Sequence, residues 1–192
     1  MTPGHQIINM KKSILILTLS LIGISGFTQP IYMTRNGQVS FFSKTPMENI
    51  DAINNEVNSM INATTGDIVF SLLVKGFRFE RALMEEHFNE NYMESDKFPK
   101  STFQGKIANP ENVDFTKAGT YAVTVAGDLT IHGIKKTIQI PGSLTVAKDK
   151  LTVVSTFPIT LADYKIEIPA LVAEKISKTL DISVNCDYKL KP

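Results

Sequence analysis

The chain has 192 residues, which suits one domain with a sizeable core and is short for two. Its hydrophobic content of 43% and charged content of 20% are ordinary for a globular protein. The net charge of +1 excludes the strongly basic surface that a nucleic-acid-binding protein needs.

The N-terminal segment has the pattern of a secretory signal peptide. Lys11 and Lys12 precede an apolar run over residues 13–27, which is short for a membrane span of about 20 residues. We therefore expect residues 1–28 to be a signal peptide, with residues 1–9 an upstream start-site artefact and Met10 the initiator. A buried or membrane-anchoring helix is the alternative. Loss of the two lysines takes the net charge from +1 to about −1.

Residues 29–192 alternate apolar and polar side chains along most of their length, which indicates β-strands. Asn36-Gly37 predicts a type I′ hairpin between residues 31–35 and 38–43. Further turns are expected at residues 65–67, 109–111, 117–119, 141–142 and 148–150. About eight strands result, each with an apolar face, and they favour a closed antiparallel barrel or a sandwich.

Two segments read as helices. Residues 82–96 place Met84, Phe88 and Tyr92 at intervals of four on one face. Residues 169–179 begin with a proline, which suits a first helical position. The first helix interrupts the run of strands, so its apolar face is expected to cover the mouth of a barrel.

The aromatic and aliphatic side chains on the expected inward faces give the candidate binding residues. They either fill the barrel as a core or line a cavity, and the helix tips the interpretation towards a cavity with a lid. The candidate residues for this cavity and lid are Phe70, Leu72, Phe79, Met84, Phe88, Tyr92, Phe98, Phe103, Ile131 and Phe157.

No catalytic motif stands out in the sequence, and we expect no enzyme activity and no cofactor. His87 and Glu90 lie on the first helix and could ligate a metal if His132 joined them, so a metal-assisted hydrolase is the alternative. His132 is expected to bond local backbone at a turn. Asp163-Tyr164 is expected to be a turn with the tyrosine packed beneath it, and the single cysteine, Cys186, a core residue.

Two stretches resemble the YceI family of exported lipid-binding proteins. Residues 127–135 (GDLTIHGIK) resemble its G-x-L-T-x-H-G stretch, and residues 98–105 (FPKSTFQG) resemble the stretch after its helix. The sequence departs from the family at residues 41–44 (FFSK), where a histidine often stands, and at the Glu- and Asn-rich residues 84–95. The resemblance covers roughly residues 29–192.

The resemblance implies an eight-stranded, lipocalin-like antiparallel barrel over residues 29–192, with an apolar cavity for a polyisoprenoid or related amphiphilic lipid in the periplasm. A lipid carrier or sensor is therefore the leading hypothesis. A ligand-free barrel with a stress or interaction role is a further alternative. The sequence does not identify the head group of the ligand, a protein partner or the oligomeric state.

Overall fold

The computed structural model describes residues 30–148 and 150–191. The expected signal peptide, residues 1–28, lies outside the described residues.

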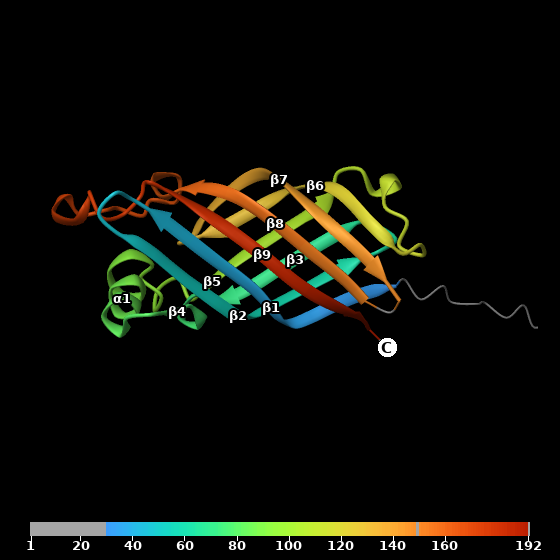
Figure 1. Ribbon diagram of the computed structural model, residues 1–192, viewed down its shortest axis with the longest axis horizontal. Coiled ribbons are helices and arrows are strands. Elements are labelled where there is room, and N and C mark those ends of the chain that lie inside the picture. Colours follow the sequence, from blue (N-terminus) through green and yellow to red (C-terminus); the bar gives the residue numbers. More distant parts are fainter. Residues whose placement is uncertain (1–29, 149, 192) are drawn as a thin grey trace, which may run out of the picture.

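The chain folds into one antiparallel sheet that closes on itself (Figure 1). The strands follow one another in the order β1-β9-β8-β7-β6-β5-β3-β2, and β1 pairs again with β2. Eight strands therefore close a barrel, while the short β4 pairs only with β2, and the expected barrel is confirmed. The strands are β1 Ile31–Lys44, β2 Asn49–Asn62, β3 Asp67–Leu73, β4 Arg78–Phe79, β5 Lys100–Ile107, β6 Gly119–Ile131, β7 Ile134–Ala147, β8 Lys150–Thr160 and β9 Thr179–Leu190.

The hairpin expected at Asn36-Gly37 is wrong, because β1 continues through both residues. The register between β1 and β2 shifts on either side of Gly37, as at a β-bulge. A Cβ atom at Gly37 would lie 2.5 Å from the Sγ atom of Cys186 on β9. The glycine therefore permits close approach of two strands, and the chain does not turn there.

The turn expected at Pro141-Gly142 is also wrong. Both residues lie within β7, which pairs with β6 along its whole length, from Gly119↔Val146 to Ile131↔Ile134. Proline is tolerated in a strand where its nitrogen does not have to donate to a neighbouring strand. The missing N–H of Pro141 instead affects the pairing of β7 with its other neighbour, β8.

The first expected helix forms and the second does not. An α-helix, α1 (Ala82–His87), continues into a π-helical segment over Phe88–Tyr92, so the helix ends before residue 96. Within residues 169–179 only a 3₁₀ turn forms, over Ala170–Val172. The amide of Ser177 donates to the buried hydroxyl of Ser43 on β1 at 2.9 Å, which ties the segment to the barrel instead of continuing a helix.

Three further 3₁₀ turns connect strands, over Val74–Gly76, Pro110–Asn112 and Leu161–Tyr164. Tyr164 is 3% exposed, and burial raises the pKa of its hydroxyl above the usual range. The turn expected at Asp163-Tyr164, with the tyrosine packed beneath it, is confirmed.

The barrel core is apolar, with one buried hydroxyl pair. Tyr188 and Cys186 of β9 are fully buried, and burial raises the pKa of the Cys186 thiol to about 11. Cys186 is thus a core residue, as expected. The hydroxyl of Ser59 donates to the carbonyl oxygen of Val69 at 2.7 Å and lies 2.8 Å from the hydroxyl of Tyr188. Since the serine proton is used, Tyr188 donates to Ser59 and both buried hydroxyls are satisfied.

His132 joins three segments at the end of the barrel that carries α1. It occupies the turn between β6 and β7 with φ of 51°. Its Nδ1 lies 3.1 Å from the carbonyl oxygen of Tyr164, and its Nε2 lies 2.9 Å from Oε2 of Glu94. Both partners are acceptors, so a ring nitrogen that carries a proton donates to the partner that it faces. The expected bond to local backbone is wrong, because both partners are distant in sequence.

Replacement of His132 should destabilise the fold. His132→Asn keeps a residue that tolerates positive φ but cannot reach both acceptors. Each lost hydrogen bond costs about 1 kcal/mol, and the melting temperature should fall by about 2–4 °C per kcal/mol for a domain of this size. Thermal unfolding followed by circular dichroism measures the change, with His87→Asn at an exposed residue of α1 as the control. An unchanged melting temperature would show that the contacts of His132 contribute nothing.

The contribution of Glu94 should depend on pH. The hydrogen bond from His132 is the main reason that the pKa of Glu94 lies below its usual 4.5, and Lys97 adds to the effect. A carboxylate with a lowered folded-state pKa stabilises the fold above its unfolded pKa, and this contribution is lost as the pH falls through the folded pKa. Glu94→Gln should therefore lower the free energy of unfolding near pH 7 and differ less from the parent below about pH 4. Urea titrations at both pH values test this, with Glu86→Gln at an exposed carboxylate of α1 as the control.

Candidate ligand cavity

A cavity of about 480 Å³ lies inside the barrel and reaches the end that carries α1. This volume is in the range of small-molecule sites. Its walls come mainly from the inward-facing side chains of the strands, and most of the lining side chains are aliphatic or aromatic. Because burial of apolar surface releases it from water, the cavity suits an apolar chain better than a polar molecule.

Most of the candidate binding residues face this cavity. Nine of the ten line it: Phe70, Leu72, Phe79, Met84, Phe88, Tyr92, Phe103, Ile131 and Phe157. Phe98 packs elsewhere, with its ring centroid 4.6 Å from that of His132 and its ring against Gly133. The role of all ten residues in binding stays a prediction.

Several lining residues were not among the candidates. Phe41 on β1 and Phe77 before β4 both line the cavity and are nearly buried. The alternation of Val39, Phe41 and Ser43 along one strand could have revealed Phe41, once the strand was not cut at Gly37. Phe77 lies between a 3₁₀ turn and a two-residue strand, where no period identifies an inward face.

Phe88 is the centre of an aromatic cluster at the mouth of the barrel. Its ring centroid lies 5.5 Å from that of Phe41, 5.6 Å from that of Phe77 and 5.0 Å from that of Phe79. Aromatic pairs at these separations attract one another beyond the effect of area burial. The helical segment is thus placed against the barrel by Phe88, and Met84 and Tyr92 lie beside it on the lining.

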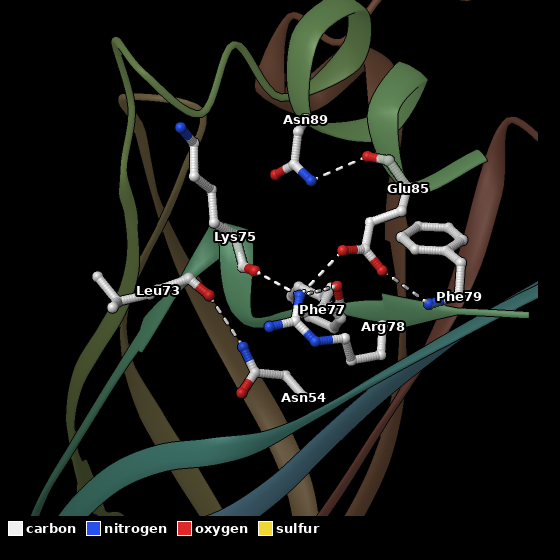
Figure 2. Close-up of polar contacts among 8 residues, drawn as sticks. All are labelled: Asn54, Leu73, Lys75, Phe77, Arg78, Phe79, Glu85 and Asn89. Atoms are coloured by element: carbon white, nitrogen blue, oxygen red, sulfur yellow. Dashed lines mark hydrogen bonds and ion pairs between the residues drawn. The ribbon is translucent and has the colours of Figure 1, made fainter. Parts of the chain in front are cut away.

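Polar contacts with β4 hold α1 in place (Figure 2). Nη1 of Arg78 donates to Oε1 of Glu85 at 2.9 Å, and the amide of Phe79 donates to Oε2 of the same carboxylate at 3.3 Å. An ion pair between Arg81 and Glu48 joins the start of the helix to the turn between β1 and β2. The helix therefore covers the mouth with an apolar contact inside and ion pairs outside.

The segment that leads into β4 and α1 is fixed by a buried side-chain amide. Asn54 of β2 is fully buried and donates from Nδ2 to the carbonyl oxygen of Leu73 at 2.9 Å. Gly76 leaves room for it, because a Cβ atom there would lie 2.6 Å from Nδ2 of Asn54. The 3₁₀ turn over Val74–Gly76 is therefore positioned by β2.

Charged groups line the cavity only towards the helix end. Glu48 and Arg81 form the ion pair described above, and His87 and Lys175 come from α1 and the segment before β9. Burial raises the pKa of the Tyr92 hydroxyl nearby. An apolar interior with charges at one end matches a molecule with an apolar chain and a polar end group.

The alternative metal site is not assembled. Among the described residues, no group of three or more His, Cys, Asp or Glu side chains could hold a metal ion. His87 lines the cavity, whereas His132 is bonded to Glu94 and to the carbonyl oxygen of Tyr164. The hydrolase hypothesis built on His87, Glu90 and His132 loses its ligand set.

Within residues 30–148 and 150–191, no helix has the length and apolar character needed to cross a bilayer.

Comparison with solved structures shows that the fold is shared. A polyisoprenoid binding domain from Saccharophagus degradans implicated in plant cell wall breakdown superimposes with a TM-score of 0.74 at 14% identity, covering 84% of this chain and 98% of that one. BcnA from Burkholderia cenocepacia gives 0.65 at 17% identity, covering 79% and 95%. The YceI protein of Campylobacter jejuni gives 0.53 at 14% identity, covering 73% and 84%. At these identities the likeness is one of fold.

A search of curated proteins finds no match. The model of the YceI-like domain, by contrast, matches residues 32–188 of the sequence. That range runs from the start of β1 almost to the end of β9 and includes every element that lines the cavity. The chain belongs to the family of YceI-like domain proteins.

Proposed function

We propose that this protein binds an amphiphilic or isoprenoid-like lipid in the barrel cavity and acts as a carrier or sensor in the cell envelope, without catalysing a reaction. The observation that carries the proposal is the cavity of about 480 Å³ with apolar walls and charges at one end. The polyisoprenoid binding domain of similar fold supports the same ligand class.

The energetics favour an apolar chain inside and a polar group at the mouth. Each buried CH₂ group contributes about 0.8 kcal/mol, so a long chain binds without specific polar contacts. A charged group moved into the apolar interior would lose its hydration without a partner. The polar end of the ligand therefore lies near Arg81, His87 and Lys175, where water and charged side chains are available.

The proposed lid can be tested at Phe88. Phe88→Asp places a charge beside the apolar chain, and the affinity for a fluorescent long-chain or prenyl probe should fall at least tenfold, which corresponds to about 1.4 kcal/mol. Leu171→Asp is the matched control, because Leu171 is 96% exposed at the same end of the barrel and does not line the cavity. Fluorescence titration measures affinity, and thermal melts separate it from stability.

Two outcomes contradict these ideas in different ways. If Phe88→Asp binds the probe as tightly as the parent, the helix is not a lid over the ligand. If the parent itself binds neither the fatty-acid nor the prenyl probe, the proposed lipid binding is wrong and the ligand-free barrel is favoured.

We further propose export to the periplasm, on the basis of the basic and apolar N-terminal pattern. Cleavage near residue 28 should leave a mature chain that begins close to Gln29-Pro30. N-terminal sequencing of the protein from cell fractions tests this. An uncleaved chain that starts at Met10 in the membrane fraction would contradict it.

A further inference from the structure

The barrel wall is incomplete between β7 and β8. Their ladder runs from Ala147↔Lys150 to Ser143↔Val154 and ends there. Continued in the same register, it would place residues 137–142 opposite residues 155–160, but within the described part of the chain these stretches do not pair with each other. Each strand stays paired with its other neighbour. The ladder between β6 and β7 continues to Ile131↔Ile134, and the ladder between β8 and β9 continues to Thr160↔Thr179.

Two prolines explain why the ladder stops. In an antiparallel strand, successive residues direct their backbone groups to opposite neighbours. The amide of Leu161 donates to Lys178 on the β9 side at 2.9 Å, so alternate residues, including Pro158, face β7. The carbonyl oxygen of Pro141 accepts a hydrogen bond from the Ser155 hydroxyl at 2.6 Å, so Pro141 faces β8.

The continued register would pair Pro141 with Thr156 and Gln139 with Pro158. Both would be hydrogen-bonded pairs, and in each of them proline has no N–H to donate. Two successive pairs that each lack an N–H donor remove backbone hydrogen bonds that would otherwise hold β7 against β8.

The cavity extends to this seam. Gly142, Ser155 and Phe157 line it from the inward faces of the two strands. Pro141 also lines it, although its side chain lies on the exposed outer face of β7. Pro141, on the outer face of β7, thus borders the same space as the inward-facing Phe157 of β8, at the place where the two strands do not pair.

Both ends of the opening are tied. Ser155 bonds to Pro141 at the end nearer the middle of the barrel. At the other end His132 bonds to the carbonyl oxygen of Tyr164, and Lys136 pairs with Asp163 at 3.8 Å. The opening is a bounded window, about 17 Å long on the β8 side for a strand rise of about 3.4 Å per residue.

A route through the barrel mouth would require more rearrangement. The mouth is covered by Phe88 in its aromatic cluster, and α1 is held by the contacts of Glu85 and Arg81. The window between β7 and β8 has a single hydroxyl–carbonyl bond at its inner end and no ladder to break.

We propose that the window between β7 and β8 is the lateral passage through which the apolar chain of a ligand enters and leaves the cavity. The inference rests on the proposed lipid binding. The chain slides sideways between the strands while its polar end stays in water, so no charge crosses the apolar interior and α1 stays in place.

A disulfide across the window tests the passage. Gln139 and Pro158 face each other in the continued register and are both exposed, so Gln139→Cys with Pro158→Cys is the pair that forms a disulfide when the two strands come within about 7 Å between Cα atoms. The matched control is Thr156→Cys with Ser183→Cys, a directly opposed pair on the intact β8–β9 seam. Cys186 remains in both variants, because burial keeps its thiol protonated and unreactive.

Stopped-flow fluorescence with a long-chain probe should show uptake and release slowed at least tenfold in the oxidised Gln139→Cys/Pro158→Cys variant and restored by a reductant. The oxidised control should exchange the probe at the parent rate. Unchanged exchange in the stapled variant, with the disulfide verified by mass spectrometry, would overturn the passage. Absence of any probe binding by the parent would instead overturn the proposed function.

A second variant decides the matter if the cysteines do not join. Pro141→Val with Pro158→Val restores both missing amides, so the ladder should extend, the new amides should become protected from hydrogen exchange, and probe exchange should slow. Unprotected amides would contradict the role of the prolines. Protected amides with unchanged probe exchange would contradict the passage itself.

Discussion

The pairing of β1 with both β2 and β9 is the constraint on which the structure depends. It closes the sheet, so backbone donors and acceptors at its two edges find partners and an enclosed interior results. The bulge around Gly37 lets this long strand bend and keep both neighbours. The inward side chains of the strands then face one interior, and the cavity is the part of that interior which they leave empty.

The two ends of this interior are organised differently. Near the buried Tyr188–Ser59 pair the barrel is packed, and the two hydroxyls are satisfied by each other and by the carbonyl oxygen of Val69. At the other end, separate chain segments meet through side chains: Glu85 joins α1 to β4, and His132 joins the β6–β7 turn to Glu94 and Tyr164. These contacts are few and partly solvent-exposed, and such regions open more readily than a strand ladder. The unpaired stretch between β7 and β8 lies towards this end as well, so motion that admits a ligand is expected between these strands, with α1 in place.

The sequence predicted the barrel because alternation along a strand reports an inward face directly. The face that holds Ile68, Phe70 and Leu72, for instance, is the one that lines the cavity. The helix with Met84, Phe88 and Tyr92 was found for a similar reason, since its apolar residues recur at helical spacing. The resemblance at residues 98–105 and 127–135 supplied what alternation cannot, namely closure rather than a sandwich.

Predictions from the sequence were wrong where a local conformational preference competed with contacts to distant parts of the chain. Asn36-Gly37 favours a tight turn, but pairing on both sides keeps β1 extended. Pro141-Gly142 also favours a turn, yet the ladder with β6 carries the strand through it and the proline acts on the β8 side instead. Phe98 was assigned to the cavity by its bulk, although its ring packs on His132. In each case the deciding partner is remote in the chain.

The contact between Gly37 and Cys186 has a consequence for the divergence of this sequence. A Cβ atom at position 37 and the sulfur at position 186 would occupy the same space, with 2.5 Å between them. An alanine at position 37 therefore requires the Cys186 side chain to move aside or to be replaced by a smaller one, and the carbonyl oxygen of Val57, 3.2 Å from the same Cβ, leaves little room on the other side. Substitutions at positions 37 and 186 are thus expected to depend on each other.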